Sequence, residues 1–149
     1  MIKRKSIKTK FGWLTAYEIN GKIFQISFGK VRKQSKSNIL EKFKKNLISF
    51  FGKKTNLIKG PFEIKGSKIQ KKIWHELKKI EYGKVKTYGE IANKYKISPR
   101  HVGKICGQNK LILAVPCHRV IRSNGSLGGF TSPGGVKLKK KLINFEKIN

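Results

Sequence analysis

The chain contains no aspartate, and its seven acidic residues are all glutamates, of which only Glu146 lies beyond Glu90. This absence excludes three common arrangements that depend on aspartate: Ser-His-Asp catalysis, EF-hand calcium loops and aspartate-based Mg²⁺ sites. Any carboxylate that assists acid–base chemistry must therefore be one of the seven glutamates.

Long apolar stretches and cysteines are also scarce. No apolar run approaches the roughly 20 residues that a helix needs to cross a bilayer. The basic start, residues 1–5, leads into no apolar segment typical of a secretory signal. Without such a signal, the two cysteines, Cys106 and Cys117, indicate a reducing compartment. We therefore expect a soluble protein of the cytoplasm, or of the nucleus in a eukaryote, that does not act at a membrane.

Positive charge dominates the composition, with 36 Lys and Arg residues against seven Glu and a formal net charge of +29. A field of this sign concentrates polyanions, so the charge favours nucleic acid as the partner. An acidic protein or a membrane surface is the alternative that charge alone leaves open. Lysine is abundant throughout the chain, so part of the charge is also consistent with coding bias, and none of it identifies a reaction.

The first 65 residues have the pattern of a small α/β domain. Residues 11–31 are rich in β-branched and aromatic residues, and Asn20-Gly21 predicts a type I′ hairpin between two strands. Residues 39–51 place apolar side chains at helical spacing, and Gly52 is expected to end that helix. A turn and a brief linker follow, which predicts a domain boundary at about residue 65.

The next segment predicts three helices. An apolar stripe runs from Ile69 to Ile80, and Thr87 with Glu90 forms a capping box that opens a short helix through Tyr95. Ser98 is an N-cap for a further helix that runs to about Cys106. The last two helices form a helix-turn-helix, which in so basic a protein predicts DNA binding.

A candidate nucleophile follows these helices. Residues 111–115 are apolar and predict a strand that ends at Pro116 and delivers Cys117 beside His118. A thiolate is suited to attack an sp³ carbon, and His118 could take its proton directly or through a water. Neighbouring residues on a strand point to opposite faces, so a turn or a bridging water is required. Glu146 is the carboxylate expected to orient His118.

Three other interpretations fit the same residues. Cys117 could be a buried, inert cysteine, which is the commoner fate of a cysteine beside a histidine. A zinc site would use His101, Cys106, Cys117 and His118, but their spacing matches no finger or ribbon, so we expect no metal and no cofactor. A cysteine hydrolase built on Cys117, His118 and Glu146 would need an oxyanion hole and would leave the helix-turn-helix unexplained.

The segment Pro116-Cys117-His118-Arg119-Val120 resembles the active-site motif of the O6-alkylguanine-DNA alkyltransferases, the methylated-DNA–protein-cysteine methyltransferases. The resemblance covers essentially all of residues 67–149, whereas residues 1–65 match only in general layout. It implies an α/β (α+β) fold: an N-terminal α/β domain, 1–65, followed by a C-terminal winged helix-turn-helix-like domain, 66–149, for DNA binding and alkyl transfer.

The resemblance also implies an activity. A monomer would bind double-stranded DNA, flip out an O6-alkylguanine and move its alkyl group irreversibly onto Cys117, once per molecule; O4-alkylthymine is a further candidate substrate. Base flipping is needed because the O6 position lies inside the duplex. A DNA-binding lesion sensor of the same fold is the alternative, but such relatives lack the cysteine.

The roles implied by the resemblance are assigned residue by residue. By resemblance, Cys117 occupies the position of the alkyl acceptor. His118 would activate it through a water, and Glu146 would orient His118. Asn109 would tie the second helix to the active-site strand, Tyr88 would rotate the nucleotide and protonate the departing guanine, and Arg100 would fill the gap in the base stack. The other expected DNA contacts are Ser98, Pro99, His101 and Gly103. The expected pocket comprises main chain at Cys117 and Val120, Phe130 as a wall, and Thr131 or Ser132 facing O6.

Three positions depart from the family pattern. His101 stands where a small residue is frequent, and Phe130 stands where many members have tyrosine. The loop at residues 131–135 is slightly longer than usual. These departures bear on affinity and substrate range rather than on the class of reaction.

Overall fold

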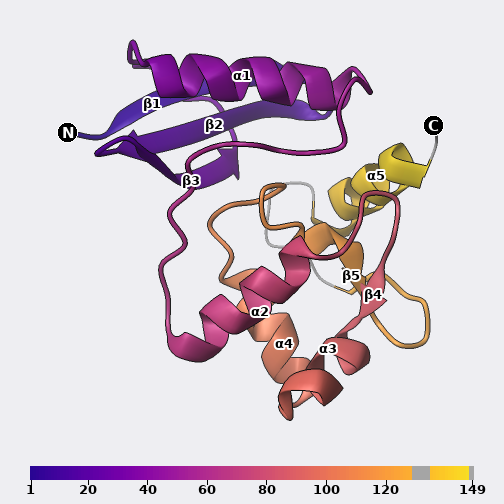
Figure 1. The fold of residues 1–149 in the computed structure, drawn as a ribbon. Coiled ribbons are helices and arrows are strands. Elements are labelled where there is room, and N and C mark those ends of the chain that lie inside the picture. Colours follow the sequence, from indigo (N-terminus) through magenta and orange to yellow (C-terminus); the bar gives the residue numbers. More distant parts are fainter. Residues whose placement is uncertain (129–134, 148–149) are drawn as a thin grey trace. The chain divides into compact units, whose positions relative to one another are not determined.

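The structure is a computed structural model that describes residues 1–128 and 135–147. The chain divides into two compact units, residues 1–64 with 110–114, and residues 65–109 with 115–149. The sequence predicted a single boundary near residue 65, and it did not predict that residues 110–114 belong to the first unit. Both helices and strands are present, in agreement with the predicted mixed fold class (Figure 1).

The first unit contains a three-stranded antiparallel sheet in the order β1-β2-β3. The predicted hairpin is confirmed as β2 (Gly12–Ile19) and β3 (Lys22–Phe28). Its turn residues have positive φ angles, 50° at Asn20 and 81° at Gly21, as a type I′ turn requires. The strand β1 (Lys3–Thr9) was not predicted from the sequence, because its frequent lysines and arginine obscure the apolar alternation.

One helix, α1 (Asn38–Phe51), covers this sheet (Figure 1). Ser37 Oγ accepts a hydrogen bond from Leu40 N and so caps the helix at its start. The predicted end is confirmed, because Gly52 is the C-cap and its N–H donates to the carbonyl oxygens of the last turn. The buried face of the helix repeats at helical spacing and comprises Leu40, Phe43, Leu47 and Phe50.

The prediction of a strand at residues 111–115 is wrong. Ile26 N donates to Lys110 O at 2.8 Å, and one isolated bridge joins Ile26 to Leu111. The backbone then turns at Leu113, where φ is 70°. A left-handed residue cannot continue an extended strand, so the apolar side chains of this segment are buried by a bend rather than by a ladder.

The second unit begins with α2 (Lys68–Lys78), which opens at a capping box formed by Ser67 and Gln70. Two short strands, β4 (Lys86–Thr87) and β5 (Val120–Ile121), pair in parallel. A 3₁₀ turn, η1 (Cys117–Arg119), precedes β5, and α5 (Gly135–Lys147) ends the described chain.

The predicted helix-turn-helix is present as α3 (Tyr88–Tyr95) and α4 (Pro99–Gly107). Thr87 Oγ1 accepts from Glu90 N at 3.0 Å, and Ser98 Oγ accepts from His101 N at 3.0 Å, so both predicted caps form. Lys96 adopts a left-handed backbone, with φ at 56°, and turns the chain between the helices. The buried side chains of the pair include Ile91, Ala92, Val102 and Ile105. Among the described residues, none of the helices combines the length and apolar character needed to cross a membrane.

Candidate active site

The candidate nucleophile lies on a tight turn. Cys117 N donates to Val115 O at 2.8 Å, and Arg119 N donates to Pro116 O at 3.0 Å. These bonds shape η1, which is the turn that a cysteine and a histidine adjacent in sequence were expected to need. Cys117 and His118 are both buried, so the turn fixes two reactive side chains away from bulk water.

Asn109 donates hydrogen bonds both to the segment before this turn and to the sulfur of Cys117. Its Nδ2 donates to Val115 O at 2.8 Å and to Cys117 Sγ at 3.3 Å. The first bond is the link between the end of the helix-turn-helix and the active-site segment that the resemblance implied. Burial raises the pKa of the Cys117 thiol, and the Asn109 hydrogen bond and the charge of Lys139 oppose that rise. The resting group is therefore a thiol that needs a base.

His118 is joined to a buried carboxylate. Its Nε2 lies 2.9 Å from Glu146 Oε2, and both side chains are almost fully buried. Burial by itself would raise the pKa of Glu146, but hydrogen bonds from His118 and Arg119, together with their charges, outweigh it and lower the pKa to about 2. Because the carboxylate is ionised and can only accept, Nε2 of His118 carries the hydrogen and donates.

Arg119 completes this cluster. Its Nε donates to Glu146 Oε1 and its second guanidinium nitrogen, Nη2, donates to Oε2, both at 2.8 Å, while Nη1 donates to Ile80 O. Two parallel bonds from one guanidinium fix the carboxylate plane. The position of Glu146, and through it the ring of His118, is therefore determined from two sides.

The other ring nitrogen of His118 is the one available for proton transfer. Nδ1 is buried and has no hydrogen-bond partner among the residues that the structure describes. Burial lowers the pKa of His118 below its ordinary value of 6.5, against the opposing influence of Glu146. The imidazole is thus neutral near pH 7, with Nδ1 as an acceptor.

A cavity of about 670 Å³ opens beside this cluster, entirely within the second unit. Its lining residues are Tyr88, Pro99, Arg100, Gly103, Cys106, Gly107, Cys117, Arg122, Ser123 and Gly128. The structure therefore brings together five residues predicted from the sequence on one cavity wall: Tyr88, Pro99, Arg100, Gly103 and Cys117. The volume is in the range of small-molecule sites.

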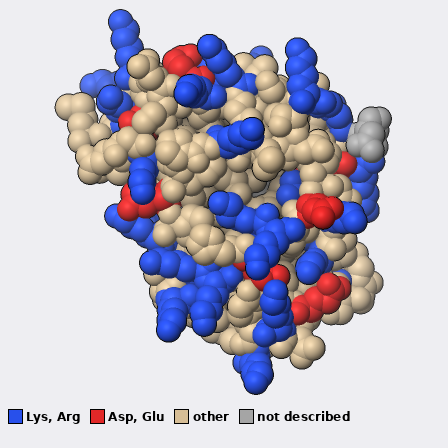
Figure 2. All heavy atoms as spheres, in the orientation of Figure 1, with Lys and Arg blue, Asp and Glu red and all other residues tan. Residues whose placement is uncertain are grey.

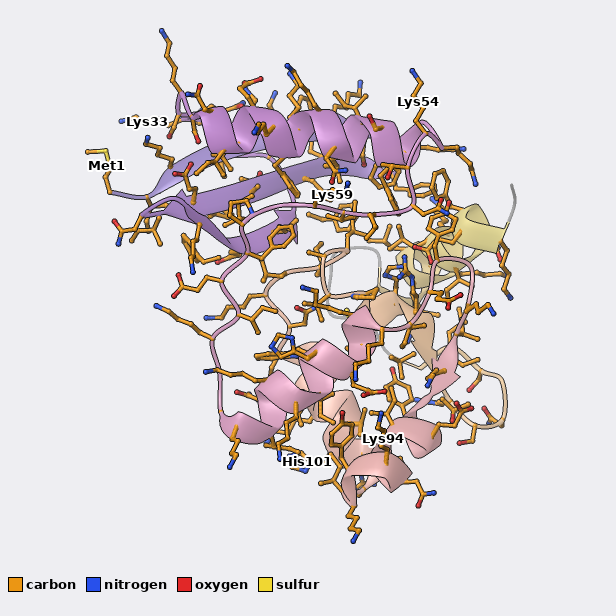
Figure 3. All side chains as sticks on the ribbon, in the orientation of Figure 1. Met1, Lys33, Lys54, Lys59, Lys94 and His101 are labelled. Atoms are coloured by element: carbon orange, nitrogen blue, oxygen red, sulfur yellow. The ribbon has the colours of Figure 1, made fainter. Side chains whose placement is uncertain are left out.

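Other predicted residues lie outside the cavity. Ser98 is the N-cap of α4, and His101 is exposed in its first turn, as Figure 3 shows. Val120 is buried at the start of β5, directly after η1. The predictions for Phe130, Thr131 and Ser132 fall outside the described residues.

Tyr88 has a buried lysine as its partner. Lys139, on α5, is completely buried, and its Nζ donates to the Tyr88 hydroxyl at 3.1 Å. Burial raises the pKa of Tyr88 to about 12, so its hydroxyl keeps its proton near pH 7. Because Lys139 binds a lone pair of the hydroxyl oxygen, the hydrogen of Tyr88 is available to another acceptor.

The sequence prediction missed Lys139, Arg119, Arg122 and the contribution of Cys106 to the cavity. A signal for Lys139 did exist, since it precedes Ile143 by four residues and Glu146 by seven and so lies on the same face of α5. Arg119 was part of the quoted motif but received no role. Arg122 and Cys106 reach the cavity only through tertiary packing.

The described residues give no support to a zinc site. Within 1–128 and 135–147, no group of three or more His, Cys, Asp or Glu side chains is placed to hold a metal ion. His101, one of the four candidate ligands, is exposed on α4, whereas Cys117 and His118 are buried. Both cysteines are free thiols.

The surface matches the expected charge pattern. Figure 2 shows Lys and Arg side chains at many places on the face that it presents, and far fewer acidic groups. Arg100, Lys96 and Lys104 are exposed on or beside α4. This distribution favours a polyanionic partner without confining it to one patch.

Comparisons with known proteins agree on one group. The model of the 6-O-methylguanine DNA methyltransferase DNA binding domain matches residues 68–148. A methylated-DNA–protein-cysteine methyltransferase of Metallosphaera sedula is 34% identical over 149 residues, which cover 98% of this chain and 94% of that protein. Another, from Saccharomyces cerevisiae, is 46% identical over 92 residues, 60% of this chain and about half (48%) of that longer protein.

A solved structure extends the comparison to the whole fold. The crystal structure of Mycobacterium tuberculosis OGT in complex with DNA is 26% identical to this chain and has a TM-score of 0.86. The match covers 97% of this chain and 92% of that one. This similarity confirms the predicted fold class.

Proposed function

Because the chain belongs to the O6-methylguanine DNA methyltransferase family, it acts in DNA repair by moving an alkyl group to a cysteine, and we propose that Cys117 accepts that group from O6-alkylguanine. The observation that carries the proposal is the position of Cys117, which lines the cavity and is followed directly by the His118–Glu146 pair. Cys106 also lines the cavity, but it lies on α4 and no histidine adjoins it in sequence.

The proposed reaction is a single displacement at an sp³ carbon. The Cys117 sulfur forms a bond to the alkyl carbon while the bond from that carbon to O6 breaks, and the electron pair of the broken bond stays with guanine. The product on the protein is a thioether, which ordinary thiols do not reverse. Each molecule therefore acts once.

His118 is the proposed base for the thiol. Its unpartnered Nδ1 accepts the Cys117 proton through a bridging water, since no direct hydrogen bond joins Nδ1 to the sulfur. The imidazolium that results is stabilised by Glu146, whose negative charge lies 2.9 Å from Nε2. Arg119 keeps Glu146 ionised and in place.

Tyr88 is the proposed acid for the departing guanine. Tyr88 lines the cavity, and its hydroxyl keeps its proton near pH 7. As the proton leaves, the charge of Lys139 at 3.1 Å stabilises the developing phenolate. Guanine leaves as a neutral base, which lowers the barrier to displacement.

Double-stranded DNA containing O6-alkylguanine is the proposed substrate, bound by a monomer in the cytoplasm, or in the nucleus of a eukaryotic cell. Residues 66–149 supply both binding and transfer, with α4 as the helix that contacts the groove through Ser98, Pro99, His101 and Gly103. Arg100 lines the cavity and is exposed, which suits a side chain that replaces the flipped base in the stack. O4-alkylthymine is a further candidate substrate.

The test is the intact mass of the protein after incubation with duplex DNA that contains O6-methylguanine. We expect a gain of one methyl group on the peptide that contains Cys117, and no gain in Cys117→Ala. Cys106→Ser is the matched control and should gain the methyl group as the wild type does. A methylated Cys117→Ala protein would contradict the assignment of the acceptor, and lesion binding without any mass gain would favour a lesion sensor.

A further inference from the structure

Arg122 lies at the cavity but has no role in the reaction described above. It follows β5 directly and lines the same cavity as Cys117 and Tyr88. Unlike those two residues, it is exposed. Arg122 therefore lies at a part of the cavity lining that solvent reaches, so it is accessible to the backbone of an entering nucleotide.

The backbone of Arg122 is held by a tight turn. Arg122 N donates to Ser126 O at 2.8 Å, and Gly125 N donates to Arg122 O at 2.9 Å. Asn124 Oδ1 accepts from both the N–H and the hydroxyl of Ser126. The side chain of Arg122 thus extends from a fixed base.

The same turn contacts the first turn of α3. A Cβ atom added at Gly89 would lie 3.0 Å from Ser123 Oγ, so the two segments are in close contact at this point. Tyr88 precedes Gly89, and Arg122 precedes Ser123. Arg122 is accordingly placed beside the residue that is proposed to act on the flipped guanine.

The charge of Arg122 is not neutralised within the protein. The cavity lining includes Arg100 and Arg122 but no glutamate. Three of the four glutamates of this unit are paired elsewhere: Glu76 with Lys94, Glu81 with Lys84, and Glu146 with Arg119. The fourth, Glu90, is exposed and does not line the cavity. Among the described residues, no carboxylate pairs with Arg122, so its guanidinium can bind an anion that arrives with the substrate.

We propose that Arg122 binds a phosphate that flanks the flipped-out nucleotide and so holds that nucleotide in the cavity. The inference rests on the proposed function, because flipping is what brings this phosphate to the cavity. A guanidinium is suited to the task, since its planar fork binds two phosphate oxygens at once. Arg100 and Arg122 then have different roles. Arg100 fills the gap in the base stack, and Arg122 binds the backbone phosphate of the flipped-out nucleotide.

The experiment removes the charge either from the phosphates that flank the lesion or from Arg122. Two duplexes carry O6-methylguanine, one with ordinary phosphates and one with neutral methylphosphonates on both sides of the lesion nucleotide. Single-turnover transfer is measured for the wild type, Arg122→Ala and Arg122→Lys. Lys72→Ala is the matched control, because Lys72 is exposed on α2 and does not line the cavity.

The wild type should lose about tenfold in rate on the methylphosphonate duplex, as expected for one charge-assisted hydrogen-bonded contact. Arg122→Ala should lose about tenfold on the ordinary duplex and nothing further on the modified one, with Arg122→Lys between the two. With free O6-methylguanine base, which has no phosphate, all variants should react at the wild-type rate; this result also shows that they are folded.

Three outcomes would overturn the inference. Arg122→Ala could be as sensitive to the methylphosphonates as the wild type, it could lose equally on the free base, or Lys72→Ala could show the same loss. A wild type that transfers no methyl group from any substrate would instead refute the proposed function, and the inference with it.

Discussion

Lys139 is completely buried, and its Nζ donates a hydrogen bond to the Tyr88 hydroxyl at 3.1 Å. Burial of a lysine disfavours its charged form, and burial accordingly lowers the pKa of Lys139, while the two neighbouring thiols favour its charge. Burying a charged group is costly unless hydrogen bonds and other charges compensate for it, so a buried lysine beside the proposed acid is a candidate for a role in the reaction. Its proximity to both the acid and the acceptor of the proposed reaction supports such a role.

Lys139→Met tests this relationship, since methionine keeps most of the side-chain volume and removes the charge. We expect transfer to slow by roughly 10- to 100-fold, the cost of one hydrogen bond to a charged group, equally on duplex DNA and on free O6-methylguanine base. Lys140→Met, at the exposed neighbouring position, is the control; a wild-type rate for Lys139→Met on the free base would refute the role.

The protonation state of His118 predicts the pH dependence of transfer. The neutral imidazole is the base, and burial lowers its pKa below 6.5, so the rate should stay level as the pH falls to 6.5 and decline only below it. The measurement is the single-turnover rate on free O6-methylguanine base from pH 8 to pH 5, with circular dichroism to verify that the fold persists. His118→Asn should lower the rate and remove this decline. An acidic midpoint above 6.5 would contradict the assignment.

Glu146→Gln should lower the stability of the protein. The substitution leaves the buried Arg119 without its counter-charge, and breaking a buried ion pair from one side costs about 3–5 kcal/mol in the free energy of unfolding. Urea unfolding measures the change. Glu81→Gln is the control, because Glu81 is mostly exposed and its pair with Lys84 is long, at 3.8 Å; we expect less than about 0.5 kcal/mol there.

The same carboxylate contributes to the acid stability of the wild type. The pKa of Glu146 is lowered from 4.5 to about 2 in the folded protein, so its contribution is present above pH 4.5 and is lost as the pH falls toward 2. Glu146→Gln should therefore show a flatter dependence of stability on pH within this window. An unchanged slope would mean that other carboxylates dominate acid unfolding.

Local signals explain which parts of the fold could be predicted. The caps of α3 and α4, Thr87 and Ser98, each bind a backbone N–H only three residues later, so a short window of sequence suffices to predict them. The prediction at residues 111–115 was wrong because their apolar, β-prone side chains favour a strand. The left-handed backbone at Leu113 depends instead on tertiary contacts. Sequence windows of a few residues do not contain that information.

The residues of the candidate site likewise fall into those that local sequence predicts and those that it does not. The pair of Cys117 and His118 is visible as a dipeptide, and Glu146 follows from the absence of any other late carboxylate. Lys139 was missed because lysine is rarely buried, and that general tendency outweighed its place on the inner face of α5. Arg122 depends on the pairing of β4 with β5, which joins residues more than thirty positions apart.

Arg100→Ala should separate base flipping from chemistry. Arg100 is exposed at the cavity, and its proposed task is to stabilise the flipped state rather than to contact the reacting atoms. Repair of duplex DNA should therefore slow far more than reaction with free O6-methylguanine base, as measured by single-turnover kinetics with each substrate. Lys104→Ala, which removes an exposed charge from the same helix, should affect the duplex less. Equal losses on both substrates would place Arg100 in the chemical step.

The net charge of +29 predicts a steep but bounded dependence of DNA binding on salt. Each neutralised phosphate contributes a slope of about −0.9 in log K against log salt. One helix-turn-helix touches only a handful of phosphates, so we expect a slope of roughly −4 to −7 rather than one that reflects the whole charge. The measurement is a titration of Cys117→Ala, which cannot be consumed by transfer, with lesion and undamaged duplexes at several salt concentrations.

The two duplexes should give nearly the same slope and similar affinities. The cavity contacts the base only after flipping, and the phosphate contacts are the same with or without the lesion, so discrimination should appear in the rate of transfer rather than in equilibrium binding. A weak salt slope combined with a large preference for lesion DNA would contradict this account, because the cavity would then supply most of the binding energy, as in a lesion sensor.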